Sequence, residues 1–385
     1  MTLFEDIERF DLEPAKHLDN TYDFYNRSAI ERISNVRDVL NDWFEKYPSD
    51  EKQEMKSRFK TSFSSAFYEL FLHELFARQG FELEAHPDIH GTEKKPDFVV
   101  KGHNVEFYLE AKEATDKTDA DKSFDNRVSN LYDQINTTNS PDFFFKLDEL
   151  KLKSKKQPSG KKVIRFLEKE LLKHNPETLS NQLRENGFDS LSKIVFEDQD
   201  LKLIVSLIPK SPNLRGEVGV RPIGVYPFDS FTGSSDISIK SAIEKKATRY
   251  GELDKPYIIA INSTSEKFTD EYDTMNALFG SLQVTFSTNP NNRDERLTRA
   301  LDGIFLDSKG AKFTRVSGVL VTNIHPGNLH NSKHWLVKHP FGKRDLDFDV
   351  FSLSKIVVEK NNIKQINGQN IQDVLGIPEN WLEDK

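Results

Sequence analysis

Apolar residues recur three or four positions apart through the first eighty residues. This spacing is typical of an amphipathic helix and recurs over 30–43, so residues 1–50 are predicted to form a helical arm. A second helical pattern covers 55–79 and is followed by Gly80, a residue that commonly ends helices. The chain is therefore expected to begin with two strong helical regions.

Strand patterns replace the helical spacing after Gly80. Short β-favouring runs at 81–86, 97–100 and 104–112 predict three strands, and 101–104 (KGHN) predicts the hairpin turn between the last two. A helix at about 123–136 and a strand at about 142–148 complete the order helix, small antiparallel meander, helix, strand.

Helices and strands alternate through the remaining sequence. Six lysines with Pro and Gly in 151–162 predict an exposed connector, and 211–235 predicts a long loop. Further helices are expected at 161–174, 177–186, 236–250, 270–280 and 293–302, and strands at 192–197, 201–208, 256–262, 315–323 and 334–338. This alternation indicates an α/β or mixed α+β fold. The expected divisions are a helical arm (1–50), a core (51–150), a basic connector with helices (151–190) and a C-terminal α/β region (191–385).

Composition narrows the classes of protein and of site. The chain has 385 residues, of which 36% are hydrophobic and 30% charged, values typical of a globular protein of two or three domains. It contains no cysteine, which excludes disulfides, thiolate metal sites and cysteine nucleophiles. The N-terminus lacks a signal-peptide pattern, and the longest apolar run, 201–209, is too short to span a bilayer. A cytoplasmic protein is expected.

The net charge of the chain bears on how it could bind nucleic acid. The formal net charge of −8 disfavours a protein that coats nucleic acid without specificity. It is compatible with an enzyme that combines a carboxylate cluster with local basic surface.

The strand 104–112 carries the most informative polar pattern. Because side chains alternate between the two faces of a strand, one face is wholly apolar and the other holds Glu106, Tyr108, Glu110 and Lys112. A turn centred on Gly102 and His103 would place Asp97 opposite Tyr108. Glu110 would then be the diagonal neighbour of Asp97, about 7–8 Å away between backbones.

Two carboxylates on one sheet face could converge on a cation. An oxygen-only ligand set suits a hard ion, so Mg²⁺ or Mn²⁺ is the expected metal. Such an ion activates water and offsets charge on a phosphoryl group. Lys112 is close enough in this arrangement to orient that water or to stabilise developing charge.

The sequence Pro96-Asp97, twelve intervening residues and Glu110-Ala111-Lys112 resembles the signature of the PD-(D/E)XK nuclease superfamily. The resemblance covers about 55–150 and implies a restriction-endonuclease-like core that hydrolyses phosphodiester bonds of DNA with Mg²⁺. It implies Asp97 and Glu110 as metal ligands, with the Ala111 carbonyl as a third. Lys112 is then the residue that positions water.

The family pattern also implies an acidic accessory ligand on the helix before the strands. Glu69 is the preferred candidate because it shares a semi-apolar helix face with Leu72, His73 and Phe76, and Glu74 is the alternative. An acidic residue on a partly apolar helix face is unusual, and Glu69 is preferred for this reason.

Several basic and polar residues are candidates for nucleic-acid contact. Arg127 and Gln134 lie on the helix that follows the E-x-K strand, where the resembling family often places polar residues over the active site. Lys245 and Arg249 are one helical turn apart and could bind backbone phosphates. For each of them an ordinary solvated helix face is the alternative.

Two other functional classes stay open from the sequence. One is a nucleic-acid-binding or assembly module on a nuclease-like fold without catalysis. The other is a structural protein in which Glu110 and Lys112 are ordinary surface charges. If the chain is a nuclease that cuts both DNA strands, a homodimer is expected. Prokaryotic restriction or anti-phage defence is inferred only by analogy with the fold.

Overall fold

The computed structural model describes residues 1–115, 119–216, 221–226, 235–264, 269–286, 295–360 and 362–382. The chain forms two compact units. The first consists of Met1–Glu13, Asn20–Asp116 and Gly233–Lys385, and the second of Pro14–Asp19 and Lys117–Thr232. This division differs from the four successive regions expected from the sequence, because the second unit is inserted within the first.

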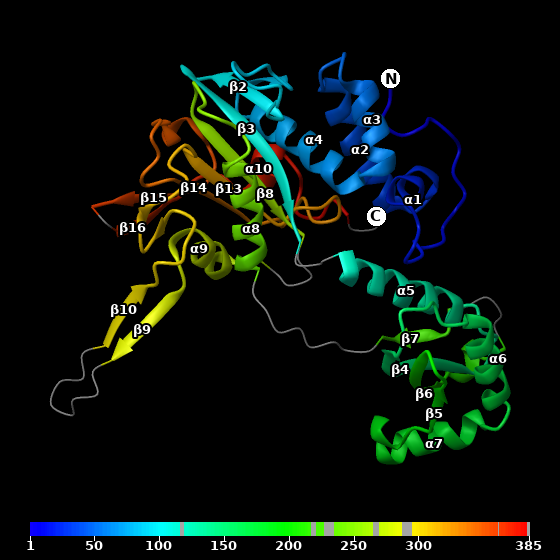
Figure 1. Ribbon diagram of the computed structural model, residues 1–385. Coiled ribbons are helices and arrows are strands. Elements are labelled where there is room, and N and C mark those ends of the chain that lie inside the picture. The colour runs from blue at the N-terminus through cyan, green and yellow to red at the C-terminus, as the bar shows by residue number, and fades with distance from the viewer. Residues whose placement is uncertain are drawn as a thin grey trace. The chain divides into compact units, whose positions relative to one another are not determined.

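A mixed sheet of eight strands forms the centre of the first unit (Figure 1). In sheet order the strands are β1 (Glu82–Ala85), β2 (Phe98–Gly102), β3 (Val105–Ala114), β8 (Tyr257–Ser263), β13 (Gly318–Thr322), β14 (His334–Lys338), β15 (Lys355–Glu359) and β16 (Asn362–Ile366). Strands β3, β8 and β13 run parallel, while β1, β2 and β3 form an antiparallel meander. The mixed α/β class predicted from the sequence is confirmed.

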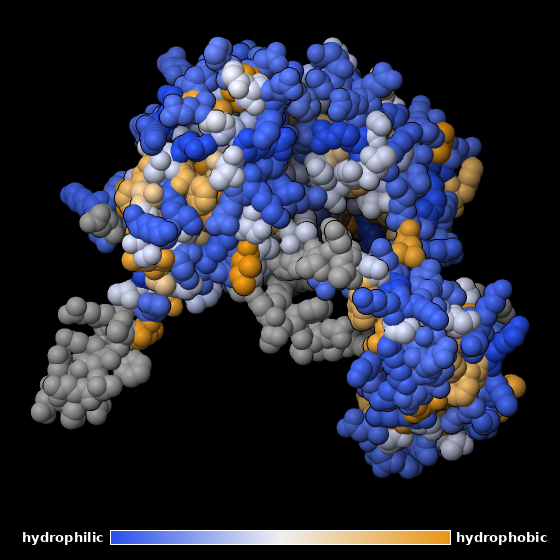
Figure 2. Space-filling model, in the orientation of Figure 1, coloured by the Kyte–Doolittle hydropathy of each residue, from blue (hydrophilic) through white to orange (hydrophobic). Residues whose placement is uncertain are grey.

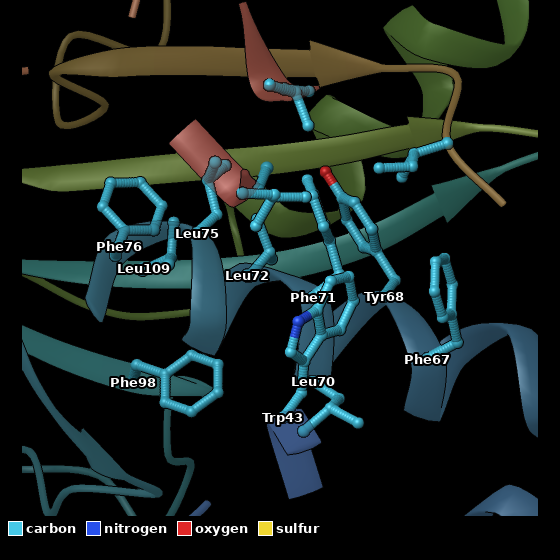
Figure 3. Packing of buried hydrophobic residues seen from close by; sticks show 14 of the residues in the cluster. Trp43, Phe67, Tyr68, Leu70, Phe71, Leu72, Leu75, Phe76, Phe98 and Leu109 are labelled. Atoms are coloured by element: carbon cyan, nitrogen blue, oxygen red, sulfur yellow. The ribbon is translucent and has the colours of Figure 1, made fainter. Parts of the chain in front are cut away.

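Helices cover both faces of this sheet. They are α1 (Thr21–Arg27), α2 (Glu31–Lys46), α3 (Lys52–Thr61), α4 (Phe63–Ala77), α8 (Asp236–Ala247), α9 (Glu271–Phe279) and α10 (Ile371–Leu375). Helix α4 is apolar on nearly all sides and is buried, as expected of a helix enclosed by other elements. Its side chains pack with Phe98 and Leu109 of the sheet (Figure 3). Ile239 and Ile243 of α8 pack on the opposite face, with Val99 and Tyr108.

The hairpin between β2 and β3 differs from its predicted register by two residues. Its turn is formed by His103 and Asn104, which have φ values of 49° and 62°. Two successive left-handed residues are the requirement of a type I′ hairpin turn. Gly102 is instead the last residue of β2, where a Cβ would lie 2.9 Å from the Phe81 ring. The predicted pairing of Asp97 with Tyr108 was therefore wrong, although Asp97 still lies on the predicted face of the sheet.

Three helix predictions also need correction. The helical arm expected over 1–50 is wrong for 1–20, because the first helix, α1, begins at Thr21. The single helix expected at 55–79 is two helices, α3 and α4, which are separated at Ser62 (φ −145°, ψ 56°). The Thr61–Ser65 segment is rich in hydroxyl side chains, which compete with helical hydrogen bonds. The helix expected at 293–302 is wrong from Glu295 onward, where β10 (Glu295–Arg299) pairs with β9 (Leu282–Phe286). Cross-strand pairing here outweighs a weak helical pattern.

The second unit contains a smaller sheet in the order β5–β6–β4–β7. Its elements are α5 (Asp119–Ile135), β4 (Phe143–Leu152), α6 (Gly160–Leu171), α7 (Pro176–Asn186), β5 (Lys193–Glu197), β6 (Leu201–Pro209) and β7 (Ile223–Val225). Apolar side chains of the three helices pack with β4, β5 and β6 in a separate core. The lysine-rich segment 151–162 belongs to this unit. Its first two residues extend β4, and its last three begin α6.

The visible surface of each unit is mainly hydrophilic, with scattered apolar residues (Figure 2). Among the described helices, none has both the length and the apolar character needed to cross a bilayer.

Candidate metal-binding active site

Asp97, the residue just before β2, lies next to Glu110 of β3. The β2–β3 register pairs Phe98 with Leu109, so the preceding Asp97 lies directly opposite Glu110. The Asp97 Oδ2 atom accepts a hydrogen bond of 2.6 Å from the backbone N–H of Ala111. This bond fixes the Asp97 carboxylate at the edge of β3, beside the residue that follows Glu110.

The backbone of β3 also presents the Ala111 carbonyl at this edge. Tyr108 N donates to Pro256 O at 2.8 Å, and Thr264 N donates to Ala114 O at 2.9 Å. Even-numbered residues of β3 therefore direct their backbone groups toward β8, and odd-numbered residues direct theirs toward β2. β2 begins at Phe98, and the Ala111 carbonyl lies past this first residue of β2. It is therefore on the same side of β3 as Asp97.

Asp97 is subject to charges from both layers of helices. Burial raises the pKa of the Asp97 carboxyl, and the Glu69 carboxylate of α4 raises it further. Lys246 of α8 and the Ala111 amide lower it, but do not offset the rise. The end of β2 is thus a point where groups from opposite faces of the sheet interact.

Glu110 is buried, with 1% of its surface exposed, and cationic and phenolic groups surround it. Lys246 Nζ forms an ion pair with Glu110 Oε1, and Arg249 Nη1 lies 3.5 Å from the same oxygen. The Tyr250 hydroxyl donates to Glu110 Oε2 at 2.5 Å. Burial raises the pKa of the Glu110 carboxyl and Asp97 raises it further, against the opposing effects of Lys246 and Tyr250. A cation bound to both carboxylates would relieve this cost.

Lys112 lies two residues after Glu110 in β3. Strand alternation therefore places it on the same face as Glu110, and its side chain is partly buried. The sequence predicted this shared face, and the strand bounds confirm it.

Glu69 lies within electrostatic range of Asp97, but its oxygens already have donors. Arg58 Nη1 and Nη2 contact Glu69 Oε1 and Oε2 at 3.0 and 2.5 Å, and the Tyr47 hydroxyl donates to Oε1 at 3.1 Å. Burial lowers the pKa of the Arg58 guanidinium, but Glu69 and Asp97 outweigh this effect and the net pKa is raised. These contacts fit a role for Glu69 in holding Arg58 near Asp97.

Glu74, the alternative to Glu69, faces a different set of groups. Its carboxylate accepts from Arg78 Nε at 2.6 Å and from Lys46 Nζ at 3.3 Å, so it serves the packing of α4 on α2. The preference for Glu69 over Glu74 as the acid near Asp97 agrees with this geometry.

The candidates selected from the sequence did not include Arg58, Lys246 or Tyr250 as neighbours of the carboxylates, whereas the position of His86 beside the predicted strands left it able to reach the site. His86 N donates to Asp97 O at 3.0 Å, and His86 Nδ1 lies 3.3 Å from Glu51 Oε2. Lys246 and Tyr250 are distant from Glu110 in sequence. Only the parallel pairing of β3 with β8 brings them close, and no local pattern encodes that pairing.

The donor set fits a hard divalent cation with few protein ligands. Asp97 and Glu110 supply carboxylate oxygens, and Ala111 supplies a carbonyl oxygen. Within the described ranges, no group of three His, Asp or Glu side chains is arranged to hold a metal ion. A site with two carboxylates and one carbonyl is consistent with this finding, because Mg²⁺ commonly retains several waters and binds one or two carboxylates.

The residues predicted to bind nucleic acid fall into two groups. Arg127 and Gln134 belong to α5 of the second unit, where Arg127 Nη1 donates to Ser154 O at 2.8 Å and Gln134 contacts Asn130. Lys245 and Arg249 lie at and just after the end of α8; Lys245 is exposed, and Arg249 reaches Glu110. Nucleic-acid binding by these four residues stays a prediction.

Comparisons of the chain with protein-family models, with curated proteins and with solved structures find no significant match. The geometry of the chain's own residues therefore carries the functional proposal.

Proposed function

We propose that this protein is a metal-dependent nuclease that hydrolyses phosphodiester bonds of DNA. The observation that carries the proposal is the placement of Asp97 directly opposite Glu110, with the Ala111 carbonyl on the same strand edge. Lys112 shares their sheet face. This is the arrangement of residues that the PD-(D/E)XK signature implies. It supports the proposal that β1, β2, β3 and α4 form a restriction-endonuclease-like core.

Asp97, Glu110 and the Ala111 carbonyl would hold a Mg²⁺ or Mn²⁺ ion. When bound, such an ion lowers the pKa of its water and stabilises charge on a phosphoryl oxygen. Lys112 would orient the attacking water by hydrogen bonding, and its ammonium would stabilise negative charge that develops on the phosphate. Before the ion binds, the Tyr250 hydroxyl would hold Glu110 in its orientation through the bond to Oε2.

Positive charge on both sides of the carboxylate pair supports a phosphodiester substrate. Arg58 lies on one side, held by the buried Glu69, and Lys246 and Arg249 lie on the other. Guanidinium groups bind phosphate oxygens in a planar, two-pronged manner. DNA rather than RNA is proposed on the implied family activity, and a homodimer would allow cleavage of both strands.

The direct test is incubation of the purified chain with supercoiled plasmid and Mg²⁺ or Mn²⁺, with RNA as a parallel substrate. Cleavage is expected with metal and absent with EDTA. Asp97→Asn should abolish it, while Asp345→Asn serves as a matched control, because Asp345 is an exposed acid of the same unit.

Intact DNA and RNA at all metal concentrations would overturn the catalytic proposal. Retention of salt-dependent DNA binding in that experiment would instead support a binding or assembly module without catalysis. Full cleavage by Asp97→Asn would overturn the assignment of the site.

A further inference from the structure

The two oxygens of Glu110 contact different kinds of donor. Oε1 is paired with the ammonium of Lys246, and the Arg249 guanidinium lies 3.5 Å away. Oε2 accepts the hydroxyl hydrogen of Tyr250 at 2.5 Å. A metal ion at Glu110 must therefore compete with groups of this chain for the same carboxylate.

Tyr250 can release Glu110 without losing its hydrogen bond. Its hydroxyl oxygen also lies 2.8 Å from the Lys95 carbonyl, and a phenol has a single hydrogen to donate. If Oε2 became a metal ligand, that hydrogen could be directed to Lys95 O. The neutral donor beside Glu110 thus has a second acceptor in place.

The contact between Glu110 and Lys246 differs from the contact with Tyr250, because Lys246 carries a positive charge and the Tyr250 hydroxyl is neutral. The Lys246 side chain is only 13% exposed, so its ammonium is largely removed from water while it neutralises Glu110. Bringing a divalent cation to Glu110 would leave this ammonium beside further positive charge. Leaving a mostly buried charge without a partner is strongly unfavourable. An anion that arrives with the metal would remove that penalty.

We propose that Lys246, assisted by Arg249, is an internal counter-ion that couples metal binding at Asp97 and Glu110 to binding of a phosphate diester. This inference rests on the proposed function for the location of the metal. Lys246 pairs with Glu110 when the site holds neither ligand, and it transfers to a phosphate oxygen when both bind. Its stem of four methylene groups permits this exchange from a fixed helix position.

The coupling has a reciprocal consequence. If the phosphate diester strengthens metal binding, metal strengthens binding of the diester by the same factor. Metal alone would bind weakly, because it would have to compete with Lys246 for Glu110. The site would then be assembled chiefly when an anionic substrate is present.

The test is a titration of the full chain with Mn²⁺, followed by electron paramagnetic resonance, with and without dimethyl phosphate. In the wild type, dimethyl phosphate should strengthen Mn²⁺ binding by about fivefold or more, the lower end of typical coupling. Lys246→Met should bind Mn²⁺ more tightly than the wild type in the absence of dimethyl phosphate and should lose most of the coupling. Lys364→Met, which removes the charge of an exposed lysine on β16 of the same unit, is the control and should behave as the wild type does.

Unchanged coupling in a folded Lys246→Met protein, or weaker Mn²⁺ binding without the diester, would overturn the inference. If that variant fails to fold, Arg249→Gln replaces it, because the Arg249 side chain is 41% exposed. It should change affinity and coupling in the same directions by a smaller factor, and no change would overturn the inference.

Asp97→Asn separates this inference from the proposed function. If Asp97→Asn binds Mn²⁺ as the wild type does, the proposed metal site is wrong. If it abolishes binding while Lys246→Met leaves the coupling intact, only the role of Lys246 is wrong.

Discussion

Both nitrogens of the Arg58 fork contact the buried Glu69 carboxylate, at 3.0 and 2.5 Å. The exposure of the partners is unequal: 27% of the Arg58 side chain is accessible, against 2% for Glu69. Loss of Arg58 would therefore leave a buried carboxylate unpaired, whereas loss of Glu69 would leave a guanidinium that can reach water. The pair joins α3 to α4 and holds a cation near Asp97.

Arg58→Met is expected to destabilise the protein more than Glu69→Met. Removal of one partner from a buried ion pair costs about 3–5 kcal/mol, and the full penalty applies when the remaining charge is buried. Urea denaturation of both variants measures the difference. Lys364→Met, which breaks an exposed pair with Glu359, should change the free energy of unfolding by about 1 kcal/mol or less. A larger loss for Glu69→Met than for Arg58→Met would contradict the structure.

Glu69→Gln should retain Mn²⁺ binding within about threefold of the wild type, well below the 10- to 100-fold loss typical when a group supporting a metal ligand is mutated. The reason is that both Glu69 oxygens already accept hydrogen bonds from Arg58 and Tyr47. Calorimetric titration with Mn²⁺ measures this affinity. A loss as large as that of Asp97→Asn would show Glu69 to be a direct ligand, as the sequence resemblance implies.

Asp97 is expected to reduce the stability of the metal-free protein as pH rises. Its pKa in the folded protein is raised from 3.8, so the folded state binds more protons than the unfolded state just above that pH. Stability contributed by the protonated form is consequently lost as pH increases through the folded pKa. Asp97→Asn should remove this loss and raise Tm at neutral pH.

Thermal melts from pH 4 to 8 in EDTA test this expectation. Asp345→Asn, at an exposed acid, should follow the wild-type profile. Excess Mn²⁺ should then reverse the order at neutral pH, because ligand binding stabilises only the protein that retains Asp97. A lower Tm for Asp97→Asn in EDTA would contradict the electrostatic account.

Lys112→Ala is expected to reduce kcat for DNA cleavage by about 10²–10³, the effect of removing one group that stabilises transition-state charge. Mn²⁺ affinity should remain, because Lys112 supplies no ligand. Lys101→Ala, on the exposed part of the neighbouring strand, is the control. Equal loss of cleavage in the two variants would argue against a specific role for Lys112.

Tyr250→Phe should destabilise the fold by about 1–3 kcal/mol, because it leaves the Lys95 carbonyl and Glu110 Oε2 without their shared donor. Tyr272→Phe provides a comparison, since Tyr272 is exposed. Denaturant unfolding measures both. No difference between the two variants would show that the Tyr250 hydroxyl bonds contribute little.

The sequence was most informative where local rules suffice. Strand alternation alone placed Glu110 and Lys112 on one face, and the hairpin signal brought Asp97 to that face. The turn centre was wrong because Gly102 is used for close packing against Phe81, whereas Asn104 supplies a left-handed conformation that non-glycine residues rarely adopt. A register error of two residues leaves Asp97 on the same face of the sheet and changes only the residue that lies opposite it on β3.

The remaining part of the site depends on contacts between distant segments. Glu110 and Lys246 are 136 positions apart. Arg58 lies on α3 and acts on Asp97 only through space, and no local pattern specifies this pairing of distant segments. The sequence singled out Lys245 and Arg249 of the helix expected at 236–250 as candidates for phosphate contact. It did not indicate which lysine turns inward, because helix periodicity cannot specify a partner across the sheet.

The insertion of the second unit between β3 and β8 has a consequence for synthesis of the protein. A nascent chain that has reached residue 150 already contains Asp97, Glu110 and Lys112, but it lacks β8, the parallel neighbour of β3, and α8, the helix that supplies Lys246. Contacts of such long sequence separation form late and slowly. The surroundings of Asp97 and Glu110 are thus completed only after translation passes residue 263. A product that ends earlier would carry the two carboxylates without the enclosed, charge-balanced site.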